Sequence, residues 1–252
     1  MVGPDFSSPS TLSVEDLSYS YGGISALRHV DMSVGAGEIC CVLGPNGAGK
    51  TTLGAALAGV LSTPAGTVSM DGGDVSGEGV CERARRGVAY VPEGGAVFPS
   101  LSVVENLSVG RTSPSKRAGE ILEQAAQHFP FLTARRRQRA GLLSGGEQRM
   151  LALARILVTK PKLTIIDELS HGLAPVIVEQ LFQALDSARG ITTFVLIEQY
   201  LERAYGLADR LLVLSSGNVL YTGQASGITI TEVETMYSLR ASIAQENRGA
   251  DP

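Results

Sequence analysis

One short segment of the chain has the residue types and spacing needed to hold phosphate groups. It fits the pattern G-x-x-x-x-G-K-S/T and consists of Gly44-Pro45-Asn46-Gly47-Ala48-Gly49-Lys50-Thr51-Thr52. Glycines permit positive φ angles and let backbone N–H groups converge on phosphate oxygens. Lys50 supplies a mobile charge for β and γ phosphates, and Thr51 offers a hydroxyl oxygen to Mg²⁺.

Two neighbouring carboxylates, Asp167 and Glu168, form the second half of the predicted phosphate site. They end the apolar run Leu163–Asp167, which is typical of a buried strand. Successive strand residues face opposite ways, but at the end of a strand two side chains can diverge toward one pocket. We expect Asp167 to hold Mg²⁺ through water. We expect Glu168 to act as a general base on the attacking water, an effect worth roughly 10²–10⁴ in rate.

Two further polar residues also follow apolar strands. Glu93 comes after Gly87–Val91, and Gln199 comes after Thr192–Ile197. Open α/β sheets bind ligands at the carboxyl ends of their strands, so these residues are predicted to share one site with Lys50. Glu93 can offer oxygen to Mg²⁺ or water. Gln199 can hydrogen-bond a γ-phosphate but cannot titrate as an imidazole does.

The elements that position these residues alternate between strands and helices. Segments of helical period follow the phosphate segment and the Asp-Glu pair, at Lys50–Leu61 and Pro175–Arg189. This alternation predicts an α/β fold with a parallel sheet covered on both faces. We expect a small antiparallel addition from Thr11–Leu17 and Leu27–Val34, and likewise from the hairpin of Leu211–Ser215 with Asn218–Thr222.

The strand signal disappears between about Glu93 and Lys160, which predicts a helical subdomain inserted over about residues 94–160. A capping box at Ser102-Val103-Val104-Glu105 opens a short helix there, and Lys116–Phe129 and Glu147–Thr159 are also helix-like. A final helix is predicted over Glu232–Gln245. The interpretation is a single domain over residues 11–245, with flexible tails at 1–10 and 246–252.

A second anion site is predicted at Leu143-Ser144-Gly145-Gly146-Glu147-Gln148. Ser144-Gly145-Gly146 caps the helix Glu147–Thr159 at its N-terminus, where free N–H donors and the positive end of the dipole face outward. One chain cannot easily bring this helix end to its own phosphate loop.

The three motifs, in this order, resemble those of ABC (ATP-binding cassette) ATPases of the P-loop NTPase class. The resemblance spans about Leu12 to Tyr237. It implies an ATPase in which two subunits pair head to tail, with ATP and Mg²⁺ clamped between one loop and the partner's signature. Ser144, Gly145, Gly146 and Glu147 are then expected at the nucleotide of the other subunit. Tyr21 matches the aromatic that stacks on adenine.

Within this family the chain is most similar to the LivF-type ATPases of branched-chain amino acid uptake. The matching segments are Val91-Pro92-Glu93-Gly94, Gln138-Arg139-Ala140-Gly141, Gly172-Leu173-Ala174-Pro175 and Ile197-Glu198-Gln199. Most ABC ATPases have Gln at the position of Glu93 and His at that of Gln199, so both are subgroup features. Leu169, where Pro is usual, and His171, where Leu is common, depart from the subgroup.

This resemblance implies a bacterial importer that works at the cytoplasmic face of the cell membrane. Its partners would be a second ATPase, homo- or heterodimeric, two transmembrane permeases and, indirectly, an external solute-binding protein. Phe98, Pro99 and Leu101 are candidates for the groove that receives a permease helix.

Composition excludes several classes of protein. The 252 residues carry a net charge of −4 and contain 5% aromatic residues and no Trp, which speaks against a nucleic-acid partner. The basic run at 135–139 and the arginines Arg83, Arg85 and Arg86 are interpreted as solvated faces. Cys40, Cys41 and Cys81 are interpreted as reduced thiols. No apolar stretch reaches the ~20 residues that span a bilayer, and the first ten residues do not resemble a secretion signal.

Three alternatives to an uptake ATPase stay open. The chain could serve another ABC transporter, or it could be a regulatory subunit that hydrolyses ATP weakly, as Leu169, Glu93 and Gln199 suggest. It could also belong to the ABC ATPases that act on nucleic acid or ribosomes, although the second cassette, coiled coils and zinc modules usual there are missing from the sequence.

Overall fold

A mostly parallel sheet built from short apolar runs forms the centre of the protein. The computed structural model describes residues 8–63, 65–94, 97–110 and 118–236. Within these residues the sheet has six strands in the order β10-β9-β3-β8-β7-β6, and only β10 runs antiparallel to its neighbour. The strands are β3 (Ile39–Leu43), β6 (Val88–Val91), β7 (Leu163–Asp167), β8 (Thr193–Ile197), β9 (Arg210–Ser215) and β10 (Asn218–Gln224).

The central strands are apolar at successive positions because both faces of the sheet are covered. In β3, Cys40 and Val42 pack into a cluster with helix α1 (Lys50–Leu57), while Ile39, Cys41 and Leu43 pack into a second cluster with the other helices. Cys40 and Cys41 are therefore fully buried, whereas Cys81 is exposed.

A second, antiparallel sheet covers the α1 side of the main sheet. Among the described residues it has four strands in the order β2-β1-β4-β5. Apolar residues of β1, β2 and β4 share one cluster with α1 and the near face of the main sheet. The strands are β1 (Leu12–Tyr21), β2 (Ile24–Val34), β4 (Ala65–Met70) and β5 (Gly73–Asp74).

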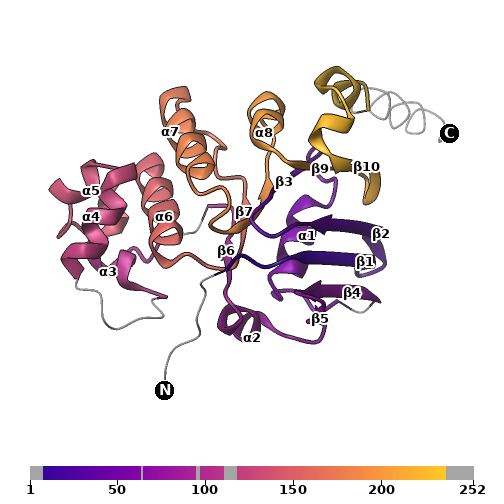
Figure 1. Cartoon of the computed structure of the whole chain (residues 1–252), viewed down its shortest axis with the longest axis horizontal. Coiled ribbons are helices and arrows are strands. Elements are labelled where there is room, and N and C mark those ends of the chain that lie inside the picture. The colour runs from indigo at the N-terminus through magenta and orange to yellow at the C-terminus, as the bar shows by residue number, and fades with distance from the viewer. Residues whose placement is uncertain (1–7, 64, 95–96, 111–117, 237–252) are drawn as a thin grey trace.

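Figure 1 shows helices α3 to α6 gathered at one end of the molecule, away from β1 and β2. They all lie between β6 and β7 in the sequence. Ser102 caps the first of them through the predicted capping box: its hydroxyl accepts from the Glu105 N–H at 3.3 Å, and the Glu105 carboxylate accepts from the Ser102 N–H at 2.7 Å. The helices are α3 (Val103–Ser108), α4 (Ala118–His128), α5 (Phe131–Ala134) and α6 (Gly145–Thr159), with a 3-10 turn at Ala140–Leu142.

The remaining helices pack beside strands of the main sheet. They are α2 (Val80–Arg85), α7 (Pro175–Asp186) and α8 (Leu201–Leu207). No described helix is both long and apolar enough to cross a membrane. The last predicted helix is helical from Ile230 to Met236, and its remainder, like most of both predicted tails, lies outside the described residues.

The fold class is confirmed, and so is the antiparallel hairpin of β9 and β10. The hairpin is not a separate addition, however, because β9 pairs in parallel with β3 and so extends the main sheet. The helix after the phosphate loop is also shorter than predicted. It stops at Leu57, and Gly59 then adopts a left-handed φ of 73°.

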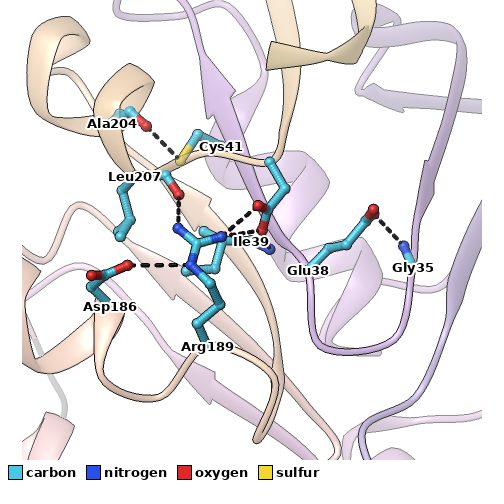
Figure 2. Close-up of polar contacts among 9 residues, drawn as sticks. Gly35, Glu38, Ile39, Cys41, Asp186, Arg189, Ala204 and Leu207 are labelled. Carbon is cyan, nitrogen blue, oxygen red and sulfur yellow. Dashed lines mark hydrogen bonds and ion pairs between the residues drawn. The ribbon is translucent and has the colours of Figure 1, made fainter. Parts of the chain in front are cut away.

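The edge of the sheet opposite the phosphate loop is held by a charged network around Arg189 (Figure 2). Its guanidinium contacts the carboxylates of Asp186 at 3.2 Å and Asp209 at 2.5 Å, and donates to the Leu207 carbonyl at 2.7 Å. Asp209 in turn accepts from the Ile39 N–H at 2.8 Å. A cation near the C-terminal ends of two helices is electrostatically favourable, and here it also fastens α7 and α8 to the start of β3.

The interpretation of Arg83 as part of a solvated cluster is wrong. Its side chain is 1% exposed, and its guanidinium donates to the carbonyls of Ala56, Leu57 and Val75 at 2.8, 2.5 and 2.9 Å. The first two carbonyls belong to the last turn of α1, where the helix itself has no N–H donors for them. Arg83 thus caps the helix that begins at the phosphate loop.

We predict that Arg83→Met lowers the free energy of unfolding by about 3 kcal/mol, because three backbone carbonyls each lose a hydrogen bond from a charged donor. Arg85→Met, an exposed change in the same helix, should stay within about 0.5 kcal/mol. Urea denaturation followed by circular dichroism measures both. Equal effects of the two variants would contradict the capping role.

Candidate nucleotide-binding site

The turn between β3 and α1 has a backbone that requires glycine. Gly49 has a φ of 104°, and a Cβ atom there would lie 2.4 Å from the carbonyl oxygen of Ala26. A Cβ atom on Gly44 would lie 2.3 Å from the Leu214 carbonyl oxygen. Both distances are far inside van der Waals contact. Because these positions carry no side chain, the turn packs against β2 and β9.

The ammonium group of Lys50 lies inside this turn. Its Nζ donates to the carbonyl oxygens of Gly44 at 2.8 Å and Pro45 at 3.2 Å. Burial lowers the pKa of Lys50, and the carboxylates of Glu168, Asp167, Glu198 and Glu93 oppose that effect. A buried ammonium group is a suitable receptor for the oxygens of a phosphate chain, whereas the nearby carboxylates call for a further cation to offset their charge.

Asp167, the last residue of β7, has a buried carboxylate that lacks hydrogen-bond donors in the described part of the chain. Neither of its oxygens has a hydrogen-bond partner among the described residues. Burial raises the pKa of Asp167 to about 6, and the Thr51 hydroxyl opposes the rise although its geometry falls short of a hydrogen bond. Two unsatisfied carboxylate oxygens beside a hydroxyl fit the oxygen ligands that Mg²⁺ prefers.

The remaining ligands of such an ion would come from outside the protein. Among the described residues, no group of three or more His, Cys, Asp or Glu side chains could hold a metal alone. Mg²⁺ commonly takes one or two protein ligands and completes its shell with substrate phosphates and water. Asp167 and Thr51, with Glu93 nearby, fit this second kind of site.

Glu168 is held in a strained conformation with its carboxylate between two side chains. Its φ of 49° is left-handed, which is uncommon for a residue other than glycine. The Gln199 amide donates to its Oε1 at 2.5 Å, and Nδ1 of His171 lies 3.7 Å from its Oε2. The next residue, Leu169, is buried in the core.

One open hollow brings most of the predicted residues together. It is lined by residues 46–52 and by Glu93, Glu168, His171 and Gln199. Asp167 lines an adjoining hollow with Glu168 and Gly145. The prediction that these side chains share one edge of the sheet is thus confirmed by their positions, while the role of each stays a prediction.

The second predicted anion site, residues 143–148, is capped as predicted. It does not reach the phosphate loop of its own chain. The Ser144 hydroxyl accepts from the Glu147 N–H at 3.3 Å, and the Glu147 carboxylate accepts from the Ser144 N–H at 2.9 Å. Ser144, Gly146 and Glu147 line neither hollow. Ser144 and Gly145 are exposed at the start of α6, where backbone N–H groups have no acceptor within the helix.

Tyr21 lies at the end of β1 and is 49% exposed. Its ring meets that of Tyr19 edge to face, with centroids 4.9 Å apart. An exposed ring fixed by a neighbouring ring suits stacking on a flat base, so the predicted adenine contact remains a prediction with a supporting geometry.

Three residues around the carboxylate pair received no role in the sequence analysis. Arg149 of α6 donates to the carbonyls of Glu168 and Leu169 at 2.5 and 2.7 Å. Ser170 and Glu198 hydrogen-bond each other in the interior. The available signal was weak: Ser170 and Glu198 are polar residues just beyond apolar strands, as the predicted residues are.

Comparison with known proteins gives a family match. The protein-family model described as "ABC transporter" matches residues 27–171 of this chain. The high-affinity branched-chain amino acid transport ATP-binding protein BraG of Pseudomonas aeruginosa is 40% identical over 90% of this chain and 98% of its own. The probable branched-chain amino acid transport ATP-binding protein LivF of Archaeoglobus fulgidus is 34% identical over 83% of this chain and 90% of its own.

A similar fold is found among solved structures. An ATP-binding cassette of an ABC transporter, solved in its ADP conformation, superimposes with a TM-score of 0.73 and 27% identity, over 91% of this chain and 95% of its own.

We predict that Lys50→Ala weakens ATP binding by roughly 10- to 100-fold or more, because charge-assisted hydrogen bonds to the phosphates are lost. Titration with a fluorescent ATP analogue measures the change. Lys162→Ala, at the opposite end of the sheet where β7 begins, is the matched control and should bind normally. An unchanged affinity in Lys50→Ala would contradict the assignment of this turn.

Proposed function

Because this chain belongs to the ABC transporter family, as an ATP-binding subunit whose ATP hydrolysis is coupled to transport, we propose that it drives uptake of a branched-chain or related small amino acid or amide. The observation that supports this cargo most strongly is the 40% identity to a branched-chain amino acid transport protein, over almost the full length of both chains. The second relative, at 34% identity, is named for the same substrates.

The proposed hydrolysis uses the residues at the edge of the main sheet. The turn before α1 and Lys50 bind the phosphates of ATP, with the γ-phosphate directed toward Glu168 and Gln199. Thr51, Asp167 and Glu93 would hold Mg²⁺, and that ion would neutralise negative charge on the phosphate oxygens. Glu168 takes a proton from the attacking water. Gln199, already bonded to Glu168 at 2.5 Å, keeps that carboxylate in place and offers its amide to the γ-phosphate.

A second copy or a related cassette is the proposed partner at the open face of this site. The exposed helix end at Ser144 and Gly145 has N–H donors and a positive dipole that need an anion. A nucleotide bound at the phosphate loop of the same chain would not reach this helix end, because Ser144, Gly146 and Glu147 do not line the hollow at that loop. Pairing two chains head to tail gives each helix end a γ-phosphate, so ATP binding stabilises the dimer and hydrolysis releases it.

A permease helix is proposed to dock beside Phe98, Pro99 and Leu101, which places the chain at the cytoplasmic face of the membrane. Phe98 is 45% exposed, so its apolar ring is accessible to a partner. The buried Asn106 fixes this segment: its amide oxygen accepts from the Phe98 N–H, and its amide nitrogen donates to the Phe98 and Leu101 carbonyls at 3.0 and 3.2 Å. The Arg155 guanidinium lies 5.3 Å from the centre of the Phe98 ring.

We predict that Glu168→Gln reduces ATP hydrolysis by about 100-fold or more while ATP still binds. Because ATP then persists between the chains, dimers should accumulate when ATP is added. Phosphate release and analytical ultracentrifugation measure the two effects. Glu179→Gln, which removes an exposed carboxylate paired with Arg203, should behave as wild type. Undiminished turnover in Glu168→Gln would refute its role as the base, and negligible turnover in the wild-type chain would favour a regulatory subunit.

We also predict that the chain, reconstituted in vesicles with its permeases, hydrolyses ATP faster when a binding protein loaded with leucine, isoleucine or valine is present. The unloaded binding protein is the control for this stimulation. Stimulation by an unrelated solute, and by none of these amino acids, would reject the proposed cargo.

Phe98→Asp should lose binding to the permeases, because the charge enters an apolar contact.

A further inference from the structure

The loop that follows β7 is tied to the loop that follows β8 by a buried acid and a buried hydroxyl. Ser170 donates its hydroxyl to Oε2 of Glu198 at 2.5 Å and its backbone N–H to Oε1 at 3.3 Å. Ser170 is 0% exposed and Glu198 is 4% exposed. Each lies beside a residue of the proposed chemistry: Ser170 is two positions after Glu168, and Glu198 immediately precedes Gln199.

A carboxylate at this depth needs a structural reason, since burying a charge costs free energy unless fixed donors compensate. Burial raises the pKa of Glu198, and the hydroxyl and N–H of Ser170 together with the Gln199 N–H counteract the rise. Glu198 does not line the hollow at the phosphate loop. Apart from the electrostatic effect of its charge on Lys50, Glu198 can influence the reaction through the residues it holds.

Further hydrogen bonds around Ser170 and Glu198 connect the same two loops. The Glu168 N–H donates to the Ile197 carbonyl at 2.9 Å, and the Gln199 amide donates to the Glu168 carboxylate at 2.5 Å. From the other side, Arg149 holds the Glu168 carbonyl at 2.5 Å. The backbone of Glu168 is thus anchored from both sides, and the Ser170–Glu198 bond is the buried link that fixes the two loops beyond it.

We propose that Ser170 and Glu198 are a positioning pair that sets the Gln199–Glu168 contact and thereby the rate of ATP hydrolysis. The hydrogen bond between the two side chains acts on catalysis and leaves ATP binding nearly unchanged, because neither residue contacts the phosphate turn or Lys50 and the Glu198 charge reaches Lys50 only at a distance. This inference rests on the roles proposed above for Glu168 and Gln199.

The test compares kcat and KM for ATP in the full-length chain, alone and with its permeases. Ser170→Ala removes the hydroxyl donor, and Glu198→Gln keeps the shape of the side chain while it loses the charge and one acceptor. Both should lower kcat by about 10- to 100-fold, the factor that corresponds to a hydrogen bond with a charged group. The KM for ATP and the affinity for ADP should change by less than about twofold.

A matched control separates positioning from stability. Thr193, at the start of β8, is a buried hydroxyl residue with two backbone hydrogen bonds, to Ser10 and from Gly37, at the opposite edge of the sheet. Thr193→Val should lower the melting temperature, as Ser170→Ala does, but leave kcat within about twofold. If Ser170→Ala fails to fold, Glu198→Gln decides the question through the same ratio of kcat to KM effects.

A double-mutant cycle tests the route of the effect. If the pair acts by placing Gln199, then Ser170→Ala should change kcat by less than about twofold once Gln199→Ala is present, because the contact it adjusts is already gone. An undiminished effect in that background overturns the proposal. So does a normal kcat in both single variants, a change confined to KM, or an equal loss of kcat in Thr193→Val.

The outcomes also separate this inference from the proposed function. Full hydrolysis by Glu168→Gln would remove the basis of both. An inactive Glu168→Gln together with a normal Ser170→Ala and Glu198→Gln would leave the proposed hydrolysis intact and reject only the positioning pair.

Discussion

The arrangement of this protein depends on an imbalance of charge at one edge of a buried sheet. Four carboxylates, those of Glu93, Asp167, Glu168 and Glu198, lie close enough to Lys50 to raise its pKa against the effect of burial. Like charges in a poorly solvated place repel each other, and a triphosphate would add more negative charge to the same region. A divalent cation, the helix end behind Lys50 and fixed amide donors are the groups that make such a site able to bind its substrate.

This charge can be concentrated only because the surrounding scaffold holds its backbone rigidly. The main sheet is packed on both faces, by α1 and the antiparallel sheet on one side and by the remaining helices on the other. Arg189 fastens the far edge, and Arg83 caps the end of α1 that points away from the phosphates. Each of these arginines donates to backbone carbonyls at the C-terminal end of a helix, where the helix itself supplies no N–H donors.

Local patterns in the sequence were enough to predict most of the strands, the phosphate turn and the capping box at Ser102. These features depend on residues a few positions apart, such as Ser102 and Glu105, so composition and spacing reveal them. The shared edge of the sheet could also be predicted, since the carboxyl ends of parallel strands must meet there.

Features that join distant segments could not be predicted in this way. Arg83 looked like a surface charge because its acceptors in α1 are 26 and 27 positions away, and Ser170 meets Glu198 across 28 positions. Strand β4 carries few apolar residues and exists because it pairs with β1. The parallel pairing of β9 with β3 was not predicted, because a short apolar run followed by a turn does not show which distant strand it pairs with.

The burial of β3 has a practical consequence for thiol chemistry. Burial raises the pKa of Cys40 to about 12 and that of Cys41 well above its usual value, so neither forms the thiolate that attacks electrophiles. Cys81, exposed on α2, is the remaining cysteine of the 252-residue chain. A maleimide dye or spin label therefore attaches at a single native position on the surface, and the unmodified protein is already suited to measuring how far apart two copies come when they associate.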